Sequence, residues 1–305
     1  MTRQDIEAAA GRIQAHVRRT PVVQIGEVSA GGYDLHLKLE SLQPTGSFKV
    51  RGAFSLLTTV EVPEAGVVAA SGGNFGLAVA HAAGNLGVAA LIFVPETSPA
   101  AKVEGIAASG AEVRVVPGHY PEALAAANAW SSDSGALQAH AYDQAAVVAG
   151  QGTCALEMTE DFPDVDTIVV AVGGGGLIGG IASWVRDDVR VIGVETEQCP
   201  TLFEARRAGR PLEVQVGGIA ASAMGASRIG EHAWFANQWI DDSVLVDDGS
   251  AIEAMQWLWA ESRLVAEPAA AAPLAALHTG AYEPEPGETV VAVISGANTD
   301  PGTVI

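Results

Sequence analysis

The stretch "GVVAASGGNFGLAVAHAAGNLGVAALIFVPE", residues 66–96, contains one complete unit of the pattern that sets the fold class. An apolar run at 66–71 is followed by an alanine-rich segment from Asn74 to about Leu86 and by a second apolar run at 88–96. Continuous apolar runs are typical of parallel strands buried on both faces, and the longer segment between them predicts a helix. The stretch therefore predicts a strand–helix–strand unit of a parallel sheet.

The same alternation continues through most of the chain. Further strands are predicted at 111–117, 166–172, 189–195 and 289–295, and further helices near 99–110, 121–133, 147–160 and 177–187. This alternation favours an α/β fold with two lobes, each a doubly wound parallel or mixed sheet. Ligands of such sheets bind beyond the carboxyl ends of the strands, so we expect the active site in the cleft between the lobes. Residues 197–250 have no clear pattern.

Composition excludes several classes of partner. The 305 residues are 49% hydrophobic and 17% charged, with a formal net charge of -20, which disfavours binding to nucleic acid or to an anionic membrane surface. The N-terminus lacks a signal-peptide pattern, and no stretch approaches the roughly 20 apolar residues of a membrane span. Cys154 and Cys199 lack metal-ligand spacing. We therefore expect a soluble cytoplasmic protein with reduced thiols.

The stretch "QPTGSFKVRGAF", residues 43–54, holds one of only three lysines, Lys49. "PTGS" is turn chemistry, and Phe48, Phe54 and Leu57 are spaced for burial on a helix that begins near the lysine. Partial burial and the positive end of the helix dipole both disfavour an ammonium group, so we expect the pKa of Lys49 to be lowered. A neutral buried lysine is suited to form a Schiff base with a carbonyl group.

Three loops at predicted strand ends carry further candidates. "AVGGGGLIGG" (171–180) presents backbone N–H groups at a helix N-terminus, which favours an anion such as a phosphate. "SGGNFG" (71–76) offers Ser71 and Asn74, and "ISGANTD" (294–300) offers Ser295. A lysine, a phosphate loop and polar groups at strand ends together suggest a carbonyl cofactor that carries a phosphate, and pyridoxal phosphate fits this description.

One alternative reading of the glycine loop stays open on these residues. Gly174, Gly176 and Gly179 also satisfy the G-x-G-x-x-G pattern of dinucleotide binding, and Glu195 ends the next strand at about the spacing of the acid that binds the ribose. The chain could on this ground be an NAD(P)-binding oxidoreductase. This reading leaves Lys49 unexplained.

The motifs taken together resemble the fold-type II pyridoxal-phosphate enzymes, whose fold is like that of the tryptophan synthase β subunit, in the branch of serine/threonine dehydratases (threonine ammonia-lyases) and serine racemases. The resemblance covers nearly the whole chain through "KLESLQPTGSFKVRGA" (38–53), "SGGNFG", "GQGT" (150–153), "GGGGL" (173–177), "GVE" (193–195), "VAEP" (265–268) and "SGAN" (295–298). It implies an ammonia-lyase that dehydrates and deaminates a β-hydroxy amino acid such as serine or threonine to a 2-oxo acid and ammonia. A racemase of the same family and a non-catalytic amino-acid-binding relic remain alternatives.

The resemblance also implies a role for individual residues. Lys49 would be the Schiff-base lysine, Phe48 would pack against the cofactor ring, Asn74 would hydrogen-bond its phenolic oxygen, and Ser295 would face its ring nitrogen. The phosphate would lie on Gly173, Gly174, Gly175, Gly176 and Leu177. The substrate carboxylate would be held by Ser71, Gly72, Gly73, Asn74 and Phe75, and Ser71 is a second candidate for catalysis.

Three departures from the family pattern modify these expectations. Phe75 stands where the family has histidine, and its larger apolar side chain is expected to reshape the pocket. Racemases have a serine at the position of Gly72, where it acts as the base opposite the lysine; since glycine has no side chain, we expect elimination with little racemisation. The optional metal site of the family pairs the position of Glu195 with a carboxylate where this chain has Thr201, so no metal is expected.

The resemblance further implies a division of the chain and an assembly. Residues 1–50 and 145–305 would form a large cofactor-binding domain, and residues 51–144 a small α/β domain on the substrate side. The family tendency implies a homodimer.

Overall fold

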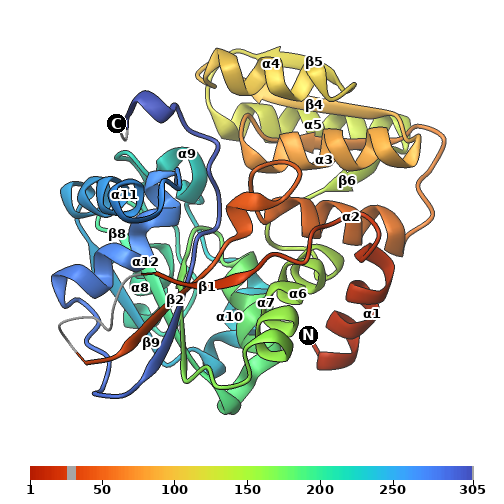
Figure 1. Ribbon diagram of the computed structural model, residues 1–305. Coiled ribbons are helices and arrows are strands. Elements are labelled where there is room, and N and C mark those ends of the chain that lie inside the picture. The colour runs from red at the N-terminus through yellow and green to blue at the C-terminus, as the bar shows by residue number, and fades with distance from the viewer. Residues whose placement is uncertain (26–31, 304–305) are drawn as a thin grey trace.

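The computed structural model describes residues 1–25 and 32–303, and these form two separate sheets (Figure 1). The first sheet has six strands in the order β1-β2-β10-β7-β8-β9, and the second has four in the order β5-β4-β3-β6. All neighbouring strands are parallel except β1 and β2. The predicted α/β fold with two parallel or mixed sheets is thus confirmed.

The strands of the first sheet are β1 (Val22–Gln24), β2 (Asp34–Lys38), β7 (Thr167–Ala171), β8 (Arg190–Thr196), β9 (Asp242–Val246) and β10 (Thr289–Val293). Those of the second sheet are β3 (Val67–Ala70), β4 (Ala90–Pro95), β5 (Glu112–Val116) and β6 (Leu137–Ala139). The six strands predicted from apolar runs are all present. Four others were not predicted from the sequence: β1, β2, β6 and β9. Two of these are only three residues long, and β9 is an edge strand with a partly exposed side-chain pattern.

The α-helices are α1 (Arg3–Ile13), α2 (Lys49–Thr59), α3 (Asn74–Leu86), α4 (Ala100–Ala108), α5 (Tyr120–Ser134), α6 (Ala145–Asp161), α7 (Gly176–Val185), α8 (Thr201–Ala208), α9 (Ala221–Met224), α10 (Glu231–Ala236), α11 (Asp248–Ser262) and α12 (Pro268–Thr279). Short 3-10 turns lie at Glu40–Leu42, Arg186–Asp188, Asn237–Trp239 and Pro301–Thr303. Among the described residues, no helix is both long and apolar enough to cross a membrane.

Each sheet buries both faces, because successive side chains of a strand enter different cores. On the first sheet Val169 and Ala292 pack with α11 and α12, whereas Ile168 and Val291 pack with α6, α7 and α10. On the second sheet Val67, Ala69 and Ile92 pack with α2 and α3, and Val68 and Leu91 pack with α5. This two-sided burial explains why the strands read as unbroken apolar runs in the sequence.

Candidate active site

The loops that leave the carboxyl ends of both sheets meet around two adjoining cavities. The outer one, of about 490 Å³, is lined by residues that follow β3, β4, β5 and β6. The inner one, of about 40 Å³, is lined by the loop after β7 and by Ser295 after β10. Lys49, Asn74, Tyr142, Gly174 and Ala223 line both. The structure therefore brings the predicted lysine, glycine loop and polar strand-end residues to one place, as expected for parallel sheets.

Lys49 is the first residue of α2, and its side chain is partly exposed at both cavities. Nζ donates a hydrogen bond to the carbonyl oxygen of Ala141 at 3.0 Å and lies 5.0 Å from the ring centroid of Phe48 and 5.8 Å from that of Phe75. Burial lowers the pKa of Lys49 to about 8, although the charge of Glu267 opposes the shift. With a pKa of about 8, about half of this amine is neutral near pH 8, and the neutral amine is the form that a nucleophile or base requires.

The glycine loop after β7 leaves no room for side chains. A Cβ on Gly174 would lie 2.2 Å from the ring of Tyr142, and one on Gly176 would lie 2.3 Å from Oε1 of Gln151. Gly175 has a φ of 87°, a left-handed value that favours glycine, and it precedes the first turn of α7. Within residues 1–25 and 32–303, no side chain caps α7. Its first N–H groups therefore remain available to an anion at the inner cavity.

Asn74 is held in one orientation by two partners from distant parts of the chain. Its Nδ2 donates to Oε2 of Glu267 at 2.8 Å, and its Oδ1 accepts from Nδ2 of Asn298 at 2.9 Å. Asn298 Nδ2 also donates to the carbonyl oxygen of Thr45 at 2.8 Å. A flipped amide would direct its oxygen at the Glu267 carboxylate, so the orientation is fixed. Because Nδ2 carries two N–H groups and Glu267 accepts from one, the second can donate to an acceptor in the cavity. Asn74 does not cap its own helix.

The turn after β3 lies at the outer cavity and contains the residues that were predicted to hold the substrate carboxylate. Ser71, Gly72, Gly73, Asn74 and Phe75 all line this cavity. The Oγ of Ser71 accepts a hydrogen bond from the N–H of Gly73 at 3.3 Å, and no side chain of the described chain caps α3. Phe75 is 2% exposed and packs in the core with α2 and α3, while its ring faces Lys49.

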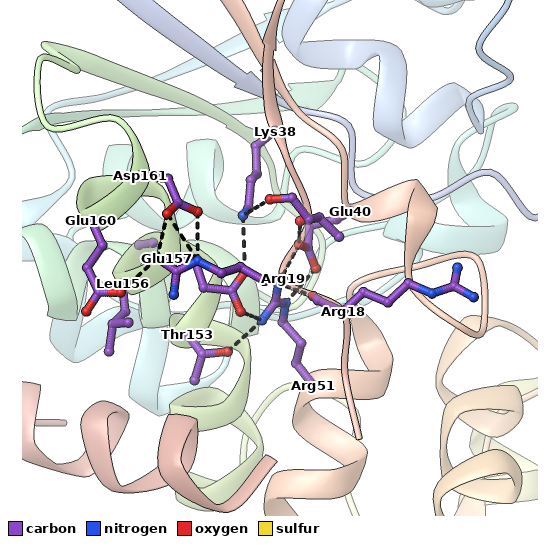
Figure 2. A network of polar contacts seen from close by, with 12 residues as sticks. Arg18, Arg19, Lys38, Glu40, Arg51, Thr153, Leu156, Glu157, Glu160 and Asp161 are labelled. Atoms are coloured by element: carbon purple, nitrogen blue, oxygen red, sulfur yellow. Dashed lines mark hydrogen bonds and ion pairs between the residues drawn. The ribbon is translucent and has the colours of Figure 1, made fainter. Parts of the chain in front are cut away.

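A buried cluster of charges fixes α2, and with it Lys49, against β2 and α6 (Figure 2). Arg51 donates to both carboxylate oxygens of Glu40 at 2.7 and 2.8 Å and to both of Glu157 at 2.8 and 2.7 Å. Lys38 lies 3.2 Å from Glu157 and donates to the carbonyl oxygen of Thr20 at 2.6 Å. Burial alone would raise the pKa of Glu40, but the charges of Arg51 and Lys38 outweigh it and hold this pKa below its ordinary value.

Several residues of the site were not identified from the sequence. Glu267 lies in the quoted "VAEP" motif, but no role was derived for it; it is 2% exposed, and burial raises its pKa. Lys102 lines the outer cavity, with its Nζ 3.7 Å from Oε1 of Glu267, and only the scarcity of lysine in the chain pointed to it. Tyr142 and Ser98 also line the outer cavity, but no sequence pattern pointed to them.

Glu195 has a structural use that weakens the dinucleotide alternative. Its carboxylate is buried and accepts from the backbone N–H groups of Leu202 at 2.8 Å and Phe203 at 2.7 Å, at the start of α8. Burial raises its pKa to about 8 despite these hydrogen bonds. Because this carboxylate is fully buried, a ribose cannot reach it. No group of metal-binding side chains occurs among the residues that the structure describes.

The residues at the inner cavity fit a phosphate-bearing carbonyl cofactor. The uncapped N-terminus of α7 provides N–H donors, and glycine at positions 174 and 176 lets this backbone pack closely against Tyr142 and Gln151. The amine of Lys49, whose pKa is lowered to about 8, lies at the other side of the same cavity, together with Phe48, Asn74 and Ser295. Their individual roles toward a cofactor stay predictions.

Comparisons with known proteins show which family the chain belongs to. The chain is 37% identical to an L-threonine ammonia-lyase of Geobacter sulfurreducens, over 98% of this chain and 76% of that protein. It is 36% identical to a biosynthetic L-threonine dehydratase of Pasteurella multocida, over 92% of this chain but only 56% of that protein. The structure of maize serine racemase matches with a TM-score of 0.93 at 29% identity, over 99% and 95% of the two chains. Residues 13–296 match the family described as "Pyridoxal-phosphate dependent enzyme", and the chain belongs to this family.

Proposed function

We propose that this protein is an ammonia-lyase that removes the hydroxyl group of a β-hydroxy amino acid, such as serine or threonine, and yields a 2-oxo acid and ammonia. The observation that carries the proposal is the position of the Lys49 amine, with its pKa lowered to about 8, between the glycine loop and the turn after β3. The names of the relatives, threonine ammonia-lyase and threonine dehydratase, support the same reaction.

The cofactor would be held by residues that line the inner cavity. Lys49 would bind it covalently through Nζ, and Phe48 would pack on its ring. The backbone N–H groups of Gly173–Leu177 would bind the phosphate, since they surround an uncapped helix start. Asn74 would donate its free N–H to the phenolic oxygen, and Ser295 would face the ring nitrogen. When bound, the cofactor would supply an electron sink that weakens the bonds at the α-carbon of the substrate.

The substrate would enter through the outer cavity. Its carboxylate would meet the N–H groups of residues 72–75 at the start of α3, with Ser71 beside them. Lys49, in its neutral form, would accept the α-proton. Phe48 and Phe75 would limit access of water to this amine, because their rings lie within 6 Å of Nζ.

We infer a large domain of residues 1–50 and 145–305 and a small one of residues 51–144, which is supported by the division of the strands between the two sheets. We also infer a homodimer in the cytoplasm. Light scattering coupled to gel filtration would test the dimer, with a mass twice the 31.1 kDa of the chain as the expected result.

The test of the function is to load the purified protein with pyridoxal phosphate and assay 2-oxo acid formation from L-serine and L-threonine. Borohydride reduction followed by peptide mass spectrometry should place the cofactor on Lys49, and the assignment is simple because the chain has only Lys38, Lys49 and Lys102. Lys49→Arg, which keeps the charge, should abolish turnover. A cofactor on another lysine would refute the assignment, and binding of the amino acid without turnover would favour a non-catalytic relic.

A further inference from the structure

The space beside Gly72 is filled by a side chain from another strand end. An ideal Cβ on Gly72 would lie 1.8 Å from Oγ and 2.6 Å from Cβ of Ser98, which follows β4. Two atoms cannot share such a space, so Gly72 must lack a side chain because Ser98 is present. A hydroxyl group therefore lies beside residue 72 although this residue is glycine, and the expectation of little racemisation stays a prediction.

The sheet order places Ser98 and Lys49 on opposite flanks of the turn that holds Gly72. In the order β5-β4-β3-β6, β3 and its turn at 71–73 lie between β4 and β6. The Lys49 amine is bonded at 3.0 Å to Ala141, which follows β6, whereas Ser98 follows β4. Figure 1 shows β6 on the α2 side of this sheet and β4 farther away. Both residues line the same outer cavity.

The Ser98 hydroxyl is also free to react. Across residues 1–25 and 32–303, its Oγ makes no hydrogen bond of its own, whereas the Oγ of Ser71 accepts one from Gly73. Ser98 is partly exposed at the cavity. Inversion of an α-carbon requires one group that removes the proton and another that returns a proton from the opposite side.

We propose that Ser98 is a further catalytic residue, which donates a proton to the substrate α-carbon on the flank opposite Lys49 and so gives the protein amino-acid racemase activity beside elimination. The proposal rests on the proposed function. The Lys49 amine accepts the α-proton, and a new Cα–H bond forms on the other side as the O–H bond of Ser98 breaks. Water in the cavity restores the proton of Ser98 and takes the one held by Lys49. One substrate proton is thus exchanged for one solvent proton, with no oxidant or reductant.

The shared space can be tested on the cofactor-free protein. The φ of Gly72 lies outside the left-handed range, so its backbone accepts alanine and only Ser98 opposes it. Gly72→Ala should therefore lower the melting temperature, and Ser98→Gly in the same chain should restore most of the loss. Strictly additive destabilisation by the two changes would show that the residues do not share a space, and would overturn the proposal.

The chemistry can be tested on the holoenzyme with L-serine in deuterated water. We expect D-serine with deuterium at Cα beside pyruvate, and a fall of about tenfold or more in the ratio of D-serine to pyruvate in Ser98→Ala. Ser109→Ala, the same change at the far end of α4, should alter neither product. Gly72→Ser with Ser98→Gly should return the hydroxyl to this place and recover D-serine.

The outcomes separate this inference from the proposed function. Pyruvate without D-serine, or equal D-serine from the native protein and Ser98→Ala, would overturn the role of Ser98 and leave elimination intact. Absence of both products from a protein that carries its cofactor on Lys49 would instead refute the proposed function.

Discussion

Replacing Arg51 by alanine should be one of the most damaging single changes that this protein can undergo. Arg51 is fully buried and makes paired hydrogen bonds to two carboxylates, Glu40 at 0% and Glu157 at 8% exposure. Without it, two buried carboxylates share only the charge of Lys38, at 3.2 Å from Glu157. Removing one partner of a buried ion pair costs about 3–5 kcal/mol, because the remaining charge stays desolvated.

This free energy converts into a measurable shift of the melting temperature. With an unfolding entropy of about 2.1 cal/mol/K per residue, a chain of 305 residues loses roughly 5–8 °C for a destabilisation of about 3–5 kcal/mol. Differential scanning calorimetry of the cofactor-free protein is the suitable assay, since it separates the stability of the chain from the stabilisation by a bound ligand.

Arg19→Ala is the matched control. Arg19 also contacts carboxylates at the end of α6, with Nε 2.8 Å from Asp161 and Nη2 2.9 Å from Glu160, but its side chain is 49% exposed. Exposed ion pairs contribute about 0–1 kcal/mol, so this variant should melt within roughly 2 °C of the native protein. Equal shifts in the two variants would refute the argument from burial.

The melting temperature at low pH provides a second test of the same ion pairs. The pKa of Glu40 is held below 4.5 in the folded protein, so its contribution to stability is present above that pH and is lost as the pH falls through the folded value. The difference in melting temperature between Arg51→Ala and the native protein should therefore shrink below about pH 4.5. A difference that stays constant down to pH 3 would mean that packing, rather than charge, sets the loss.

Three further predictions concern the site. The pKa of Lys49 is about 8, against an ordinary value of 10.5, so its labelling by pyridoxal phosphate and borohydride should rise with a midpoint near pH 8. Lys102 in the same digest is the internal control. A midpoint near 10.5 for Lys49 would contradict the argument that burial lowers its pKa. Glu267→Ala should weaken pyridoxal phosphate binding by up to about tenfold, because Asn74 loses the partner that orients it. Glu283→Ala, at the surface, should leave the binding titration of the cofactor unchanged. Equal cofactor affinities of the two variants would exclude this positioning role of Glu267. Gly175→Ala should lower the free energy of unfolding in urea by more than about 1 kcal/mol, because the new Cβ would lie 2.5 Å from Ala233. The loss should exceed that of Gly135→Ala, since Gly135 has a similar φ but open space around it. Equal losses would leave backbone strain as the sole cause.

The sequence alone contained the fold class and most of the residues around the inner cavity. The strands buried on both faces had to be continuous apolar runs, so β3, β4, β7, β8 and β10 could be predicted from local composition. Lys49, the glycine loop, Asn74 and Ser295 stood out because each follows or precedes such a strand or helix with unusual turn chemistry. The short strand β6 and the edge strand β9 lacked this signal and were not predicted.

Only the tertiary structure decided which side chains meet. Asn74 and Glu267 are 193 residues apart, and Lys38 and Glu157 are 119 apart, so no local pattern relates them. The strand order of each sheet differs from the order in the chain, and this order brings Ser98 beside Gly72 and places it across the turn from Lys49. The glycine at position 72 indicated only that this residue itself supplies no side chain, whereas its surroundings depend on which strand ends lie next to it. The hydroxyl at this place comes from β4, a neighbour that sheet packing alone provides.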